Sequence, residues 1–63
     1  MYSVLMFIGQ DGSLGLKHGE LYEVELLPLN HMFYVTVKRG LVVKAICPYE
    51  TLVGFAKNWT LPK

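Results

Sequence analysis

A glycine-punctuated turn that leads into an alternating strand is the feature that most constrains how this chain can fold. The stretch Gly15-Leu16-Lys17-His18-Gly19 is followed by Tyr22-Glu23-Val24-Glu25-Leu26, in which apolar and acidic residues alternate. Alternation with a period of two is typical of a strand with one buried face and one face in water. Glycines at 15 and 19 adopt positive φ angles at little steric cost, so the loop can fold back before the strand begins. We therefore predict a strand over residues 21–27, ended by Pro28 and a turn at Asn30-His31.

Three further segments have the composition of strands. Residues 2–8 are apolar and end at Gly9, and residues 32–37 and 41–47 are rich in β-branched or aromatic side chains. Between the first two strands, residues 9–20 hold four of the six glycines and form a loop that Leu14 and Leu16 are expected to hold against the core. The chain is thus predicted to be mainly β.

The register of the hairpin formed by residues 32–37 and 41–47 follows from its turn. A two-residue turn at Arg39-Gly40 would require a positive φ at Arg39 and would place Lys44 on the apolar face. A three-residue loop, Lys38-Arg39-Gly40 with Gly40 left-handed, avoids both problems. The predicted cross-strand pairs are then Val37 with Leu41, Val35 with Val43, and Phe33 with Ala45.

The opposite face of this hairpin is more apolar than an exposed sheet face usually is, since antiparallel sheets normally leave their outer face polar. A partner or the C-terminal segment is therefore expected to cover it. Its residues are Met32, Tyr34, Thr36, Val42, Lys44 and Ile46.

The C-terminal segment changes from strand to helix spacing. Five apolar residues fall on one helical stripe: Tyr49, Leu52, Val53, Ala56 and Trp59. Pro48 suits a first helical position, which favours a short helix. Gly54 weakens a helix, however, and a 3₁₀ turn followed by a strand through Phe55 and Trp59 is the alternative. In either case Trp59 is expected to cover the core.

The length of 63 residues predicts one domain over residues 1–63 with a small core. A single cysteine, Cys47, excludes an internal disulfide. The sequence has no CxxC pair and a predicted strand separates His18 from His31, so a zinc site has no plausible ligand set and we expect no metal or cofactor. Because Cys47 precedes a proline at an inward strand position, it is expected to be buried and inert. Motifs such as GxSxG and HExxH are absent from the sequence, so the protein is predicted not to be an enzyme.

The charge and the N-terminal sequence indicate the setting. Six basic and five acidic residues give a net charge of +1, which offers nucleic acid or an anionic membrane little attraction. Residues 1–8 are apolar but have no basic n-region or cleavage site and are too short to span a bilayer. The free thiol and the lack of a targeting segment predict a cytoplasmic protein. A hydrophobic content of 52% also favours self-association.

The order of strand, glycine-rich loop, three-strand meander and short helical turn resembles a small SH3-like barrel. The run Gly15-Leu16-x-x-Gly19-x-x-Tyr22-x-Val24 is similar to the GLxxGxxYxV run of small SH3-like proteins encoded in prophages of Gram-positive bacteria. The resemblance covers roughly residues 13–47. It implies a barrel of about five strands with a short C-terminal helix or 3₁₀ turn, in the cytoplasm of a bacterial host.

Two functions are compatible with these patterns. The first is a protein-interaction module that self-associates or inhibits a host protein, with Met32, Tyr34, Val42, Lys44 and Ile46 at the contact surface. The second is a nucleic-acid-binding barrel, in which Lys38, Arg39 and Lys44 meet phosphates while Tyr34 stacks on a base. A steep salt dependence of binding would distinguish the second function from the first.

Overall fold

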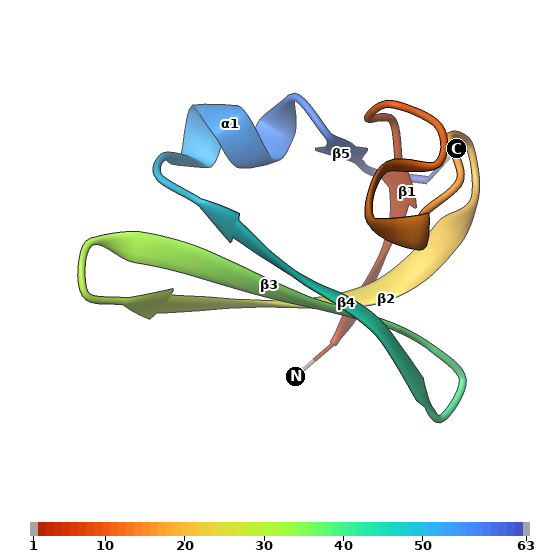
Figure 1. The fold of residues 1–63 in the computed structure, drawn as a ribbon, viewed down its shortest axis with the longest axis horizontal. Helices are drawn as coiled ribbons and strands as arrows, with labels where there is room; N and C mark the ends of the chain where they lie inside the picture. The colour runs from red at the N-terminus through yellow and green to blue at the C-terminus, as the bar shows by residue number, and fades with distance from the viewer. Residues whose placement is uncertain (1, 63) are drawn as a thin grey trace.

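Five strands form one antiparallel sheet in the computed structural model, which describes residues 2–62 (Figure 1). The strand order across the sheet is β4-β3-β2-β1-β5, and the predicted mainly β fold class is confirmed. In the described residues no ladder joins β4 to β5, so the backbone does not close the sheet into a barrel. The strands are β1 (Ser3–Phe7), β2 (Leu21–Leu29), β3 (Met32–Arg39), β4 (Val42–Tyr49) and β5 (Trp59–Thr60), and the helical segments are the 3₁₀ helix η1 (Ser13–Gly15) and α1 (Leu52–Ala56).

The hairpin of β2 and β3 turns at Asn30-His31, as predicted, with φ angles of 52° and 68°. Positive φ at both central residues defines a type I′ turn, whose twist matches that of the flanking strands. The prediction that Pro28 ends the strand is wrong, because β2 continues to Leu29. Pro28 pairs with Phe33 one step from the turn, a position where the proline nitrogen points away from β3. β1 pairs with β2 only as far as Val24, so the missing N–H breaks no ladder bond there.

The hairpin of β3 and β4 confirms a left-handed Gly40 but contradicts the predicted register. Gly40 has a φ of 63° and forms a two-residue turn with Leu41, flanked by the pair Arg39 and Val42. A type II′ turn requires a positive φ only at its first central position, which is Gly40 here. Arg39 lies in the strand before the turn and needs no positive φ. The observed partners lie further along β4 than predicted: Val37 pairs with Ala45, Val35 with Cys47 and Phe33 with Tyr49.

A β-bulge in β4 also changes which residues share a face. Val37 pairs with Ala45 but the next residue, Lys38, pairs with Val43, so Lys44 is the extra residue. Because a bulge shifts the side-chain alternation by one, Val43 and not Val42 lies on the same side of the sheet as Lys38. The predicted fourth strand is likewise extended, since Pro48 lies within β4 and not at a helix start.

The core is formed by side chains that are at most 4% exposed. Leu16 contributes from the loop and is fully buried, as predicted, whereas Leu14 is 60% exposed. Lys17 N–H donates to the Tyr22 hydroxyl at 3.0 Å, which fixes the loop to β2. The buried residues in the described chain are Phe7, Leu16, Tyr22, Val24, Val35, Val37, Cys47 and Trp59.

The C-terminal segment combines the two predicted alternatives, a short helix and then a strand. The Thr51 hydroxyl caps α1 by accepting from Gly54 N–H at 3.0 Å. The predicted helical stripe is wrong, because Leu52 and Val53 are 54% and 66% exposed and Trp59 lies in β5. Only 3% of Trp59 is exposed, so its predicted role in the core is confirmed. Within residues 2–62 no helix has the length and apolar character needed to cross a bilayer.

Candidate functional site

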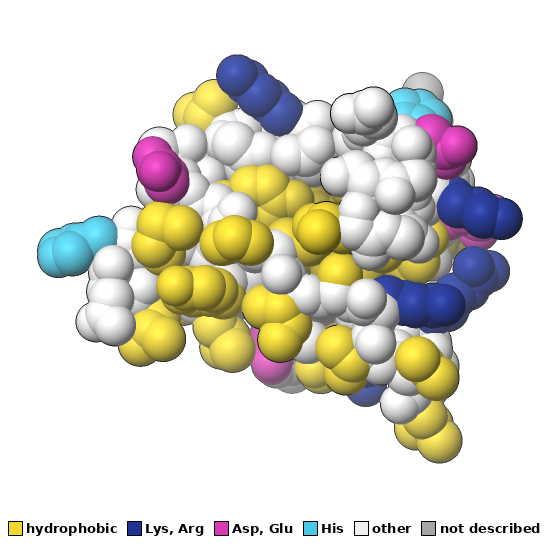
Figure 2. Space-filling view, in the orientation of Figure 1, with side chains coloured by type: hydrophobic (Ala, Val, Ile, Leu, Met, Phe, Trp, Pro, Cys, Tyr) yellow, Lys and Arg dark blue, Asp and Glu magenta, His cyan; other side chains and the backbone are white. Residues whose placement is uncertain are grey.

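The side of β2, β3 and β4 that points away from the core, called the outer face here, carries several exposed apolar residues. Its cross-strand rows follow from the register and are Leu27–Tyr34–Pro48, Glu25–Thr36–Ile46 and Leu29–Met32. Leu27, Leu29 and Ile46 are 49%, 59% and 60% exposed. In Figure 2 hydrophobic side chains run along the lower half of the molecule, from the β2–β3 hairpin to the tip of the β3–β4 hairpin.

The C-terminal helix does not cover this face. α1 packs on the opposite side of β4, where the rings of Phe55 and Tyr49 meet edge to face with centroids 5.9 Å apart. Tyr49 pairs with Phe33 and belongs to the same side of the sheet as Cys47 and Val35. The alternative that the helix buries the apolar outer residues is therefore wrong, and the face is open to contact with another molecule.

The structure brings four of the five predicted contact residues to the outer face. Met32, Tyr34 and Ile46 lie on it by strand alternation, and Lys44 lies beside Ile46 at the bulge. Val42 lies on the other side of the sheet, 59% exposed at the tip of the hairpin, and Val43 takes its expected place.

Sequence reasoning missed the contribution of β2 and Pro48 to this face. Leu27 and Pro48 flank Tyr34 on either side, and Leu29 pairs with Met32. The signal was present in the I′ turn residues Asn30-His31, which fix a two-residue hairpin and hence the pairing of every residue before them.

The cations of the nucleic-acid alternative are partly engaged with carboxylates and rings. Lys38 Nζ lies 3.6 Å from Glu23 Oε2 and 4.2 Å from the centroid of the Tyr2 ring. Arg39 Nη2 lies 3.5 Å from Glu20 Oε2, and the Arg39 guanidinium carbon lies 5.9 Å from the centroid of the Tyr22 ring. Strand alternation places Arg39 on the opposite side of the sheet from Lys38 and Tyr34. The four residues therefore do not form one basic surface, which weakens the case for a phosphate track.

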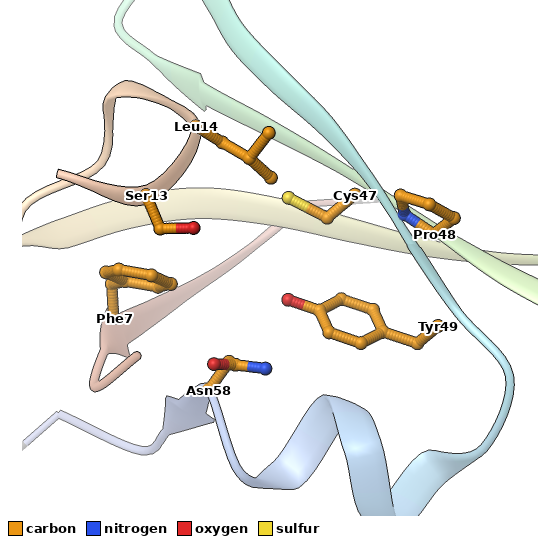
Figure 3. Close-up of a pocket in the computed structure, with 7 residues that line it drawn as sticks. All are labelled: Phe7, Ser13, Leu14, Cys47, Pro48, Tyr49 and Asn58. Carbon is orange, nitrogen blue, oxygen red and sulfur yellow. The ribbon is translucent and has the colours of Figure 1, made fainter. Parts of the chain in front are cut away.

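A hollow of about 170 Å³ lies between β4, η1 and the end of β1 (Figure 3). The Cys47 thiol and the Tyr49 hydroxyl both point into it, and Trp59 Nε1–H donates to that hydroxyl at 3.0 Å. Such a volume accommodates about one side chain or a very small molecule. The full lining is Phe7, Ser13, Leu14, Cys47, Pro48, Tyr49 and Asn58.

The ionisable groups that line the hollow have the character of buried, unreactive side chains. Cys47 is 2% exposed, which confirms that it is buried, and burial raises the pKa of its thiol above the ordinary value. Burial also raises the pKa of the Tyr49 hydroxyl. A nucleophilic cysteine requires a lowered pKa and an electropositive, accessible setting, so this thiol has the opposite character. Within the described part of the chain, no three His, Cys, Asp or Glu side chains cluster as metal ligands would.

His18 has a structural contact in the loop before β2. Its Nδ1 lies 3.0 Å from the carbonyl oxygen of Gly9, which can only accept, so Nδ1 carries the proton. The His18 backbone N–H also donates to Asp11 Oδ1 at 2.9 Å. These two bonds join the ends of the loop.

Comparison of the chain with protein-family models, curated proteins and solved structures yields no match. The function proposed below is therefore inferred from the geometry of the outer face.

Proposed function

We propose that this chain is a small, non-enzymatic protein-interaction module whose contact surface is the outer face. The observation that carries this proposal is the row Leu27–Tyr34–Pro48, which sits on the solvent side of an antiparallel sheet without any cover from the chain's own helix. Outer sheet faces are normally polar, because apolar groups there remain in contact with water in the free protein. A partner that removes this row from water would recover that free energy.

Tyr34 is the expected centre of the contact. It lies on the middle strand of the face, between Leu27 on β2 and Pro48 on β4, and is half-buried. Tyrosine is enriched among the residues that dominate binding energy, because it combines a large apolar ring with a hydroxyl that can reach a partner. Ile46 and Leu27 would form the surrounding apolar contacts.

The expected setting is a bacterial cytoplasm, with a prophage-encoded protein acting on itself or on a host protein. The run from Gly15 to Val24 supports this setting through its resemblance to small SH3-like prophage proteins. In the structure this run serves the fold, since Gly15 and Gly19 have φ angles of 78° and 87° and Tyr22 and Val24 are core residues. The setting thus comes from the resemblance, and the contact surface comes from the outer face.

The test compares Tyr34→Glu with a matched substitution elsewhere. A carboxylate at position 34 stays solvated in the free protein but would be buried without a partner in a complex. Val53→Glu places the same charge on α1, where Val53 is 66% exposed and distant from the outer face. Circular dichroism should show both variants folded.

The binding readout is self-association together with capture of proteins from a bacterial lysate at low and high salt. A protein retained by the parent chain and by Val53→Glu, but lost with Tyr34→Glu at both salt concentrations, would support the proposal. Equal binding by all three chains would contradict it, and capture that disappears steeply with salt would favour phosphate contacts instead.

A further inference from the structure

We propose that the hollow between β4, η1 and the end of β1 is a binding site for a small neutral molecule made of one ring with one hydroxyl or carbonyl group. This site goes beyond the proposed function, because it lies on the core side of β4 and shares only Pro48 with the outer face. Three properties of the hollow support the inference: its walls are fixed without a ligand, its volume suits one ring, and its lining is neutral.

Two walls of the hollow are held by residues that do not line it. On the β4 side, Tyr49 accepts the hydrogen bond from Trp59 Nε1–H. On the facing side, the Phe7 ring packs against the Trp59 ring, and Asn58 Nδ2–H donates to the Gly54 carbonyl at 3.2 Å. Neither Trp59 nor Gly54 is part of the lining, so a ligand need not break these contacts. A site that is formed before binding spares the ligand the cost of ordering it.

The third wall is η1, which is fixed through Leu16. The Leu16 side chain is fully buried, and its backbone accepts from Gly12 N–H at 2.7 Å and donates to the Ser13 carbonyl at 2.9 Å. Ser13 and Leu14 themselves are exposed. A ligand can therefore enter from solvent beside these two residues, while the backbone that carries them stays in place.

The volume of the hollow corresponds to one ring. A cavity of about 150 Å³ with apolar walls holds benzene, and this hollow measures about 170 Å³. Phe7 and Tyr49 provide aromatic rings from two different strands, and rings favour offset or edge-to-face contact with one another. Leu14 adds an aliphatic side chain (Figure 3). The volume beyond that of benzene leaves room for one small polar substituent.

The polar groups of the lining favour a ligand without charge. The Ser13 hydroxyl, the Cys47 thiol and the Tyr49 hydroxyl point into the hollow (Figure 3). Within the described chain the Ser13 hydroxyl has no hydrogen-bond partner, so it can donate to or accept from a ligand. No Lys, Arg, Asp or Glu among the described residues lines the hollow, and a buried charge without a partner is costly.

Phenol and benzoate are the probes that test this site. The two molecules are similar in size, but at pH 7 phenol is neutral and benzoate is ionised. Each is added to ¹⁵N-labelled protein up to roughly 20 mM, a range suited to weak binding of a small ligand. The reporters are the Trp59 indole N–H, which is bonded to the Tyr49 hydroxyl, and the side-chain amide of Asn58.

Phenol should shift both reporter resonances saturably, with a Kd on the order of 1 mM. Benzoate should bind at least about tenfold more weakly, because the lining offers its carboxylate no cation. Resonances of Leu27 and Thr36, whose side chains lie on the outer face, should not follow the same titration curve.

Ser13→Leu is the variant that fills the hollow, and Ser3→Leu is its matched control. Ser3 is also exposed, but it begins β1 whereas Phe7 ends that strand. Circular dichroism should show both variants folded. Ser13→Leu should raise the Kd for phenol by about tenfold or more, since its side chain occupies the ligand's volume, and Ser3→Leu should leave the Kd unchanged.

Three results would overturn the proposal: no saturable shift with phenol, benzoate binding as tightly as phenol, or equal effects of Ser13→Leu and Ser3→Leu. The first two are measured on the parent chain, so the test stands even if Ser13→Leu does not fold. Tyr34→Glu should bind phenol as the parent does, because position 34 lies on the outer face. Retained phenol binding together with lost protein capture would show that the hollow and the outer face act independently.

Discussion

Trp59 Nε1–H donates a hydrogen bond to the Tyr49 hydroxyl at 3.0 Å, and this contact connects β5 to β4. These two strands are the outermost strands of the sheet, and no backbone ladder joins them in the described chain. The Tyr49 ring also meets Phe55 of α1, and the Trp59 ring meets Phe7 of β1 with centroids 5.1 Å apart. Side-chain contacts therefore connect β4 to β5, which backbone hydrogen bonds do not join.

Tyr49→Phe should lower the free energy of unfolding by about 1–3 kcal/mol, because it leaves the buried indole N–H of Trp59 without an acceptor. Urea denaturation followed by circular dichroism measures the change. Tyr34→Phe removes the same hydroxyl from the outer face and should have a much smaller effect. If the two variants unfold at the same urea concentration, the hydrogen bond between Trp59 and Tyr49 does not contribute measurably to stability.

Stability should decrease on the alkaline side. Burial raises the pKa values of the Cys47 thiol and the Tyr49 hydroxyl in the folded protein. The unfolded chain then loses these protons first as the pH rises, so the folded state binds more protons and its stability falls. The decline should begin near the ordinary cysteine pKa of about 8.5 and continue upward.

Thermal melts between about pH 7 and pH 10 test this dependence, which spans the ordinary pKa values of both groups. Cys47→Ala should give a shallower decline over the lower part of that range, whatever its melting temperature at neutral pH. If the melting temperature stays constant or increases as the pH is raised beyond about 8.5, the pKa values of these two groups are not raised in the folded protein.

The sequence predicted the strands better than their pairing. Alternation in Tyr22–Leu26 and β-branched composition in residues 32–37 identify strands directly, because they report burial on one face. The register of β4 could not be read in this way, since Val42 and Val43 are both apolar and the bulge at Lys44 leaves no compositional signal. Pro28 and Pro48 were misread for a related reason. A proline excludes a strand only where its nitrogen faces a neighbour, and that depends on pairing.

The outer face was partly predictable for the same physical reason. Tyr34 and Ile46 were assigned to it because alternation within one strand requires no knowledge of the partner strand. Leu29 was missed because it follows Pro28, where the strand was expected to end. Leu27, the last residue of the predicted strand, was missed because placing it beside Tyr34 requires the pairing of β2 with β3. The hollow beside Cys47 could not be foreseen, since Phe7, Leu14 and Asn58 meet there only through tertiary packing.

Gly40→Ala should destabilise the fold by about 1 kcal/mol, because a Cβ is unfavourable at the φ of 63° that the type II′ turn requires. The cost is purely conformational, since an added Cβ would meet nothing within 4 Å. Leu41→Ala is the matched control at the next position, where the side chain is fully exposed and should contribute little. Equal denaturation midpoints for Gly40→Ala and the parent chain would contradict the turn assignment.

Gly9→Ala should be destabilising for a different reason, because the space around Gly9 is filled. An added Cβ would lie 2.6 Å from Phe7 Cζ and would also collide with the side chain of Asn58. Both of these residues line the hollow, and Ile8 N–H donates to the Asn58 carbonyl at 2.7 Å, so the collision forces β1 away from the turn before β5. Overpacking of this kind costs about 1–3 kcal/mol.

Gly54→Ala provides a control with the opposite sign. An added Cβ there would lie 3.5 Å from Thr51 Oγ1, an ordinary contact, and alanine is favoured over glycine within a helix by up to about 1 kcal/mol. Urea denaturation should therefore show Gly9→Ala below the parent chain and Gly54→Ala at or above it. If Gly9→Ala is as stable as the parent chain, Phe7 and Asn58 can shift to accommodate the added Cβ. The contact between β1 and β5 then does not hold the hollow in a fixed shape.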